Sequence, residues 1–171
     1  IGAGCVRRVI AAWVGNVSAG LGHNYRRAVE KQAPAPLEVL DHSNLTIAFP
    51  LQAPALGVPY LPARSLLGTD LPRANPTFKE APDPWSGAPL LLVPAVAPDV
   101  AILHVQRADE EGHPHVWGTL GVTRQAAFAA RRVILVAEQI RPRERILSDP
   151  GLVLTPALKV AAVVHEPFGA F

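Results

Sequence analysis

The sequence predicts an α/β domain in which helices lie on both faces of a largely parallel sheet. Two nearly continuous apolar runs, 99–106 and 133–140, have the composition of parallel strands that are covered on both faces. An alanine-rich stretch at 123–132 lies between them and has the composition of a helix, and residues 158–167 form a further apolar strand. Strands that alternate with helices in this way build parallel sheets.

The N-terminal part is predicted to contain a strand, a loop and a helix. Residues 6–14 are β-branched and apolar enough for a buried strand, and a glycine-rich turn follows them. The helix is expected at 24–32, where Tyr25 and Val29 have helical spacing. The segment 34–44 contains two prolines and ends this helix.

Prolines determine the prediction for the middle of the chain. Pro50 and Pro54 limit the apolar stretch 45–57 to a short or kinked helix. Residues 58–65 are expected to be extended. From 68 to 89 the chain is rich in Pro, Asp, Trp and Gly, which predicts a long excursion over the surface before order resumes at the next apolar stretch.

Length and composition are those of one globular domain, which we assign to residues 1–171. Of the 171 residues, 49% are hydrophobic and 18% are charged. No apolar run approaches the roughly 18–20 residues needed to cross a bilayer, so no membrane partner is expected. The one cysteine, Cys5, cannot form an internal disulfide, which favours a cytoplasmic protein.

Charge argues against nucleic acid as a partner. The 16 basic and 14 acidic residues give a formal net charge of +2 and are mixed along the chain. A nucleic-acid groove would need basic residues clustered together and interleaved with stacking aromatics, and the sequence shows no such cluster.

A glycine-rich loop at 15–22 contains a serine that could act as a nucleophile. Ser18 lies in "NVSAG", one residue away from the nucleophile elbow of serine hydrolases, and His165 is a candidate base. Asn16 stands where that elbow needs glycine. A serine that caps a helix or turn is therefore the preferred interpretation.

An H-x-H pair, His113 and His115, would suit the edge of a metal site if both side chains lay on one face of a strand. The intervening proline disturbs that geometry, and the nearby carboxylates Asp109, Glu110 and Glu111 do not complete a ligand set. We interpret the stretch as a polar turn and expect no metal.

The polar stretch "HVQRADEEGHPHVWG" at 104–118 belongs to a longer pattern. It follows "PDVAIL" and precedes the alanine-rich helix, "RRVILVAEQI" and "AAVVHEPFGAF". Together with "IGAGCVRRVIAAWVGN", "YRRAVE" and "LGVPYLPARSLLGTDL", this order resembles the A subunit of the family I CoA-transferases, close to the glutaconate and 3-oxoacid CoA-transferase branch. The resemblance covers nearly the whole chain and implies the CoA-transferase fold, which is NagB/RpiA-like.

Three features depart from the pattern of these relatives. They usually have asparagine where His113 follows Gly112, and alanine and leucine where Pro50 and Pro54 stand. They also carry a strand and a glycine-rich loop before the position of Ile1. Because the chain contains no methionine, we expect that its N-terminal segment is missing and that the sheet is incomplete there.

The resemblance implies CoA transfer with coenzyme A and acyl-CoA as substrates and no permanently bound cofactor. In such enzymes a glutamate attacks the acyl-CoA thioester, and CoA thiolate then converts the resulting anhydride into a glutamyl thioester. In two-chain members this glutamate belongs to the B subunit. A B-subunit partner is therefore expected, in a hetero-oligomer of two A and two B subunits or larger. A CoA-ester hydrolase and a non-catalytic assembly subunit stay open as alternatives.

No glutamate of this chain is expected to be the nucleophile. Glu110 and Glu111 precede Gly112, but the resemblance places them in variable positions of the turn, and we interpret them as exposed carboxylates. Glu138 ends the predicted strand 133–140, where α/β sheets hold their ligands, and is interpreted first as a helix-capping or interface residue.

The resemblance leaves two interpretations of the strand end at 104–118. In the first, these residues line the acyl cleft as the substrate-binding set. His104 and Gln106 then lie on one side of the strand as imidazole and amide donors, and Trp117 and Gly118 form an apolar wall. In the second, they stabilise a turn and the interface with the partner chain.

The remaining conspicuous residues of this stretch are assigned to the structure of the turn. They are Arg107, Asp109 and Gly112. Arg107 faces the other side of the strand, and we expect an ion pair between Arg107 and Asp109 to lock the turn.

Overall fold

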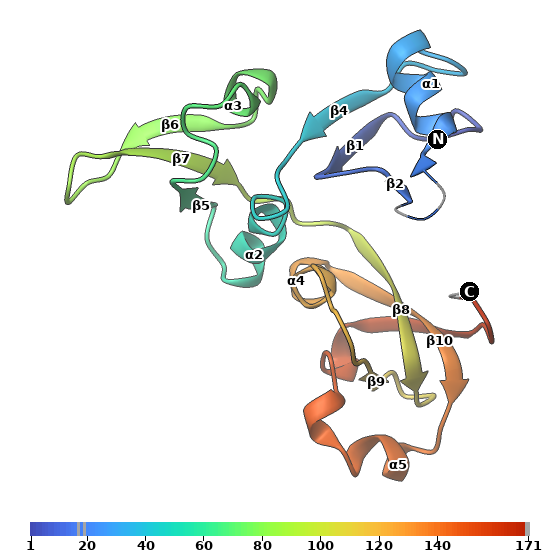
Figure 1. Ribbon diagram of the computed structural model, residues 1–171. Helices are drawn as coiled ribbons and strands as arrows, with labels where there is room; N and C mark the ends of the chain where they lie inside the picture. The colour runs from blue at the N-terminus through green and yellow to red at the C-terminus, as the bar shows by residue number, and fades with distance from the viewer. Residues whose placement is uncertain (17, 19, 170–171) are drawn as a thin grey trace. The chain divides into compact units, whose positions relative to one another are not determined.

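The computed structural model describes residues 1–16, 18 and 20–169, and the chain divides into two compact units (Figure 1). Unit 1 comprises residues 1–50 and 60–94, and unit 2 comprises residues 51–59 and those from 95 onward. The assignment of 1–171 to a single domain stays a prediction.

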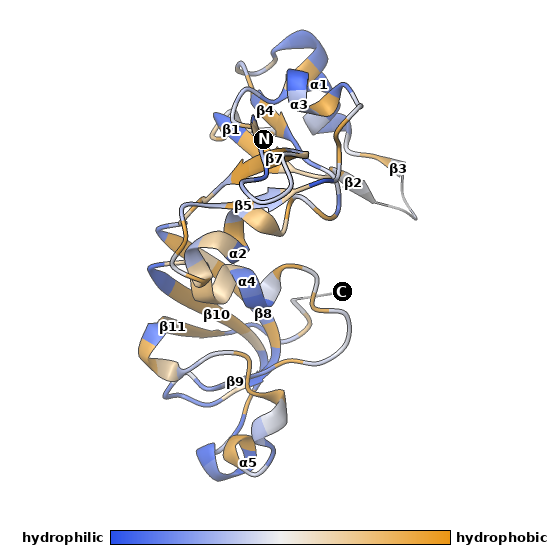
Figure 2. Ribbon diagram, turned by 90° about the vertical axis from the view of Figure 1, so that its left-hand side faces the viewer, coloured by the Kyte–Doolittle hydropathy of each residue, from blue (hydrophilic) through white to orange (hydrophobic). Residues whose placement is uncertain are grey.

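Unit 1 begins with a parallel strand pair. Its elements in chain order are β1 (Arg8–Ala11), β2 (Gly15–Asn16), β3 (Gly20–Leu21), α1 (His23–Lys31) and β4 (Glu38–Asp41), with β1 parallel to β4 and β2 antiparallel to β3. Arg8 Nε and Glu38 Oε2, 2.7 Å apart, link the paired strands. The helix is mainly hydrophilic in Figure 2 and buries Ala28. The predicted helix at 24–32 and a strand within 6–14 are confirmed, but the expected burial of this strand is not found, because no residue of β1 is buried.

A second, antiparallel sheet completes unit 1. It has the order β5 (Tyr60–Ala63), β7 (Pro89–Pro94), β6 (Lys79–Pro82), and α3 (Leu71–Ala74) precedes β6. Prolines within the sheet fit this order, because Pro62 lies on the edge strand β5 and β7 has prolines only at its two ends. The extended segment at 58–65 is confirmed, whereas the expected surface excursion at 68–89 contains α3 and β6.

The short helix α2 (Phe49–Ala55) spans the division between the units and contains Pro54, as the prolines in its sequence predict.

Unit 2 is a mixed sheet with helical segments. Its elements in chain order are β8 (Val100–Ala108), β9 (Pro114–His115), α4 (Thr123–Ala129), β10 (Arg132–Ile140), α5 (Arg143–Leu147), two 3₁₀ turns (Pro150–Leu152 and Ala157–Lys159) and β11 (Val160–His165). The sheet order is β11-β10-β8-β9; β8, β10 and β11 are parallel, and β9 is antiparallel to β8. The parallel strands and the helix between the first two are as predicted.

The two central strands of the unit 2 sheet, β8 and β10, each bury one side. On β8, Ala101, Leu103 and Val105 are buried and pack with Val133, Leu135 and Ala137 of β10. The opposite side of β8 is exposed in the described structure, with Ile102 70% exposed. The apolar run at 99–106 thus forms the expected parallel strand, but this chain covers it on one face only.

Among the described residues, no helix combines the length and the apolar character that a membrane crossing requires.

Candidate functional site

His104 and Glu138 meet at the carboxyl ends of two adjacent parallel strands of unit 2. In the β8–β10 register Val136 lies opposite His104, so Glu138 lies two residues further toward the carboxyl end of β10. His104 Nε2 donates a hydrogen bond to Glu138 Oε1 over 2.7 Å. A carboxylate oxygen can only accept, so Nε2 carries the proton. The side chains are 34% and 20% exposed, which leaves the pair accessible from solvent.

The second oxygen of Glu138 holds the C-terminal turn. The backbone N–H of Phe168 donates to Glu138 Oε2 over 2.7 Å, and Phe168 adopts the left-handed conformation with φ 61°. A Cβ atom placed on Gly169 would lie 3.3 Å from His104 Cε1. The turn formed by 166–169 therefore lies against the imidazole, and the hydrogen bonds of both carboxylate oxygens fix the Glu138 side chain.

The Gln106 side-chain amide forms two hydrogen bonds with the backbone of Trp117. Its Nε2 donates to the Trp117 carbonyl over 3.1 Å, and the Trp117 N–H donates to its Oε1 over 3.3 Å. The two bonds join the end of β8 to residue 117 across the intervening turn. Trp117 is 42% exposed, so this pairing presents an aromatic surface to solvent.

Arg107 does not make the predicted ion pair with Asp109. Its guanidinium carbon lies 5.2 Å from the centroid of the Trp117 ring, a cation–π arrangement. Both oxygens of the buried Asp109 are instead used by His113, whose backbone N–H donates over 2.9 Å and whose Nδ1 donates over 2.8 Å. These two hydrogen bonds between Asp109 and His113 close the turn, since the two residues lie at its two ends.

Gly112 is required in this turn for two physical reasons. Its φ of +95° lies in the region that favours glycine, and an added Cβ would come within 2.9 Å of Val160 side-chain atoms on β11. Gly118, at φ +91°, also needs this conformation but has open space around it. Glu110 and Glu111 are exposed, as predicted, and Glu111 Oε2 accepts from Arg143 over 2.7 Å.

The two histidines of the H-x-H pair have separate partners. His113 bonds Asp109, whereas the buried His115 uses Nε2 to donate to the Ile146 carbonyl over 2.7 Å. Within the ranges that the structure describes, no three His, Cys, Asp or Glu side chains are grouped so as to hold a metal ion. The serine-hydrolase alternative stays a prediction, because Ser18 is flanked by Val17 and Ala19, which lie outside the described residues.

Sequence reasoning named most of these residues but not their pairing. It placed His104 and Glu138 separately and missed Phe168 as the donor to Glu138. A usable signal exists for the first pair: a histidine near the end of one parallel strand and a glutamate near the end of the next. No local pattern marks the backbone N–H of Phe168.

The fold and site define a class of α/β protein that gathers polar side chains at the carboxyl ends of adjacent parallel strands, the place where such sheets hold their ligands. The profile of the coenzyme A transferase family matches residues 1–166. The chain belongs to the coenzyme A transferase family.

Two curated relatives are similar over nearly the whole chain. The A subunit of the 3-oxoadipate CoA-transferase of Pseudomonas knackmussii is 39% identical over 170 residues, which cover 99% of this chain and 60% of the relative. The A subunit of the glutaconate CoA-transferase of Acidaminococcus fermentans is 31% identical and is covered over 58% of its length. The chain thus spans about 60% of the length of these relatives.

Solved structures agree with this assignment. The crystal structure of glutaconate CoA-transferase from Acidaminococcus fermentans superimposes with a TM-score of 0.87 and 28% identity, covering 99% of this chain and 58% of that one. A variant of the decarboxylase AibA/AibB superimposes with a TM-score of 0.78, also at 28% identity, covering 99% of this chain and 62% of that one.

Proposed function

We propose that this chain is the A-type part of a cytoplasmic CoA-transferase and that the glutamate nucleophile lies on a B-type partner chain. The observation that carries the proposal is the bonding of Glu138. It is the carboxylate placed at the strand ends, yet its two oxygens accept hydrogen bonds from His104 and from Phe168 N–H. Each oxygen keeps a second lone pair, but the two bonds hold the carboxylate in one orientation and lower its nucleophilicity, which suits a group that positions others.

In the proposed reaction the partner's glutamate oxygen attacks the thioester carbonyl carbon and the carbon–sulfur bond breaks. This step gives an acyl-glutamyl anhydride and CoA thiolate. The thiolate attacks the glutamyl carbonyl and releases the donor acid, leaving a glutamyl thioester. The acceptor carboxylate then attacks this thioester, and the same two steps in reverse form the new acyl-CoA and regenerate the glutamate.

This chain contributes the opposite wall of the cleft. We assign His104, Gln106, Trp117 and Gly118 to the substrate side of that wall. The Gln106 amide fixes the Trp117 backbone, so the indole ring is presented as a positioned apolar surface. Such a surface excludes water from the anhydride, which would otherwise hydrolyse. Asp109 and Gly112 hold the turn behind it, and Arg107 lies over the Trp117 ring. We propose a hetero-oligomer with two copies of each chain or more, and no resident cofactor.

The experiment is an exchange assay on the full-length protein purified with its B-type partner. Acyl-CoA and a free acid are supplied, with 3-oxoadipate and glutaconate included as acids because two relatives are named for them. New acyl-CoA formed in equal amount to donor acid, with no net free CoA, is the expected result. Accumulation of free CoA would instead establish a hydrolase. Release of carbon dioxide would match the decarboxylase that shares this fold.

A further inference from the structure

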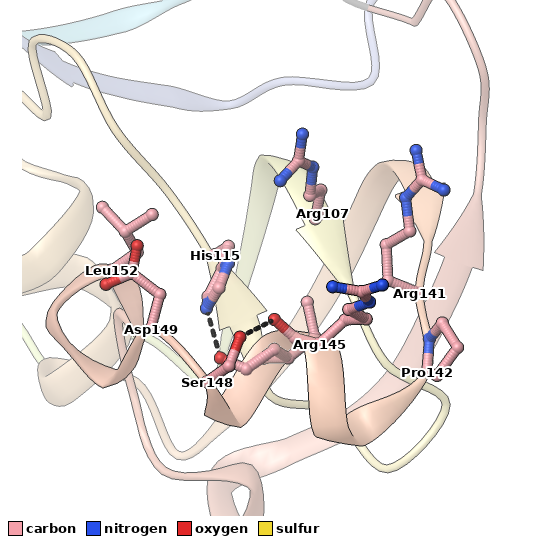
Figure 3. Close-up of a pocket in the computed structure, with 9 residues that line it drawn as sticks. Arg107, His115, Arg141, Pro142, Arg145, Ser148, Asp149 and Leu152 are labelled. Atoms are coloured by element: carbon pink, nitrogen blue, oxygen red, sulfur yellow. Dashed lines mark hydrogen bonds between the residues drawn. The ribbon is translucent and has the colours of Figure 1, made fainter.

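A pocket of about 590 Å³ lies in unit 2 beyond the ends of β8 and β10. Three arginines from three different elements line it: Arg107 at the end of β8, Arg141 just after β10, and Arg145 on α5 (Figure 3). Asp149 is the one carboxylate among the described lining residues, so these residues carry two net positive charges. Its volume falls within the range of roughly 300–1,000 Å³ that is usual for small-molecule sites.

The three guanidinium groups have no anionic partner among the residues that the structure describes. Arg107 lies over the Trp117 ring, and Arg141 bonds the Gln139 amide oxygen through Nε and Nη2, at 3.1 and 2.7 Å. Arg143, two residues before Arg145 on the same helix, is different: it pairs with Glu111 over 2.7 Å and does not line this pocket. Arginines that line one pocket without an ion-pair partner keep N–H donors for an external anion, although Arg141 already uses its Nε and one Nη2 donor on Gln139.

His115 supplies an independent observation at the same place. It lines the pocket, is 2% exposed, and donates through Nε2 to the Ile146 carbonyl. Its Nδ1 is buried without a hydrogen-bond partner. A buried polar atom left in this way is destabilising. Because Nδ1 is buried, a ligand in the pocket reaches it only if the imidazole moves; Nδ1 would then accept from an acidic O–H when the ring is neutral and donate to an oxygen when it is protonated.

We infer that this pocket binds a phosphate-bearing ligand and that the part it recognises is a phosphate monoester or a pyrophosphate group. A carboxylate has two oxygens and is satisfied by one guanidinium fork. Tetrahedral phosphate groups present more oxygens in more directions, which suits a pocket lined by three arginines from three elements. Partial protonation of phosphate near neutral pH also supplies the O–H that the neutral His115 Nδ1 can accept. The observations behind this inference do not depend on the CoA transfer proposed above, although CoA is itself one phosphate-bearing candidate.

Calorimetric titration with inorganic pyrophosphate tests the site directly. The full-length protein with its partner chain is used at about 0.15 M salt, where long-range surface attraction is largely screened. The expected result is saturable binding that Arg145→Gln and Arg141→Gln each weaken by about tenfold or more, as the loss of a charge-assisted hydrogen bond predicts. Arg143→Gln is the matched control, because it removes the same charge from the same helix outside the pocket.

Competitors identify the ligand class and its source. Displacement of pyrophosphate by CoA but not by pantetheine would assign the site to the phosphates of CoA. Binding of pyrophosphate that CoA leaves unchanged would assign it to a separate phosphorylated ligand, and either result supports the site.

Three results would overturn the inference: no saturable binding to the unaltered protein, equal weakening by Arg143→Gln, or tighter binding of glutarate than of pyrophosphate. Since the exchange assay is scored separately, a failure here is distinguishable from a failure of the proposed function.

Discussion

His104 and Glu138 are 34 residues apart in the sequence, yet their side chains meet over 2.7 Å across β8 and β10. Neither residue alone marks a site. Together with the turn at 166–169 they form a fixed group whose bonds run from imidazole to carboxylate to backbone N–H. The C-terminal turn of the described chain is thereby joined to the central strands of the unit 2 sheet.

Replacing Glu138 with glutamine tests this group. The amide of Glu138→Gln can accept from only one of the two donors, so either His104 or the turn at 166–169 is released. We expect CoA-exchange activity to fall by about tenfold or more, because a hydrogen bond to a charged group contributes about 1.5–3 kcal/mol. Glu166→Gln makes the same change in the same turn on an exposed side chain and is expected to leave activity within about twofold. Equal activity in both variants would show that the His104–Glu138 pair has no functional role.

Gly112→Ala is expected to destabilise unit 2 by about 2 kcal/mol or more, because a non-glycine residue at this φ is strained and its Cβ meets Val160 at 2.9 Å. Gly118→Ala is the matched control, since it has a similar φ but open space around it. Urea unfolding followed by circular dichroism measures both. The larger loss should belong to Gly112→Ala, and the reverse order would contradict the described packing of the turn on β11.

Gln106→Glu replaces the amide N–H that donates to the Trp117 carbonyl with a carboxylate oxygen. The carboxylate and carbonyl oxygens are both acceptors and repel each other. We expect the free energy of unfolding to fall by about 0.5–1.5 kcal/mol, the net contribution of one hydrogen bond, because both residues are partly exposed. Gln139→Glu serves as control, because Gln139 only accepts from Arg141 and a carboxylate there can still accept. A red shift of tryptophan emission confined to Gln106→Glu would accompany release of Trp117. Equal stability of the two variants would contradict the amide pairing.

His42, in unit 1, gives the fold a pH dependence. Burial lowers the pKa of His42 below its ordinary value of 6.5, although its hydrogen bond to the Thr46 carbonyl opposes the shift. The unfolded chain therefore binds this proton more readily than the folded one, so the contribution of His42 to stability is fully present above about pH 6.5 and is lost as the pH falls below it. Unfolding at pH 7.5 and pH 5.0 should show a steeper acid loss in the unaltered protein than in His42→Gln. The exposed His23→Gln variant should behave like the unaltered protein, and a parallel loss in all three would refute the role of His42.

The sequence predicts the long elements of this chain because their signals are local. β8, β10 and β11 are apolar runs, and α4 between the first two is alanine-rich. β4 and β6 escape prediction because they are short and polar, and their strand character comes from the partners that they pair with. The amino-acid composition of segments 34–44 and 68–89 does not indicate that β4 pairs with β1 or that β6 pairs with β7.

The candidate site divides in the same way. His104, Gln106 and Trp117 are identifiable from their position after an apolar strand. The pairing of Asp109 with His113 instead of Arg107 depends on the conformation of the turn, which spacing alone does not determine. The pocket lined by Arg107, Arg141 and Arg145 is formed by three elements that come together only in the folded unit, and no sequence motif predicts it.

The location of the covalent intermediate tests the central claim most directly. The full-length two-chain enzyme is incubated with acyl-CoA, the glutamyl thioester is reduced to an alcohol with borohydride, and the mass of each chain is measured. We predict that one glutamate of the partner chain is converted and that the mass of this chain is unchanged, because the bonds of Glu138 to His104 and Phe168 suit positioning and not attack. Conversion of Glu138, Glu110 or Glu111 would contradict the account and make this chain the one that carries the nucleophile.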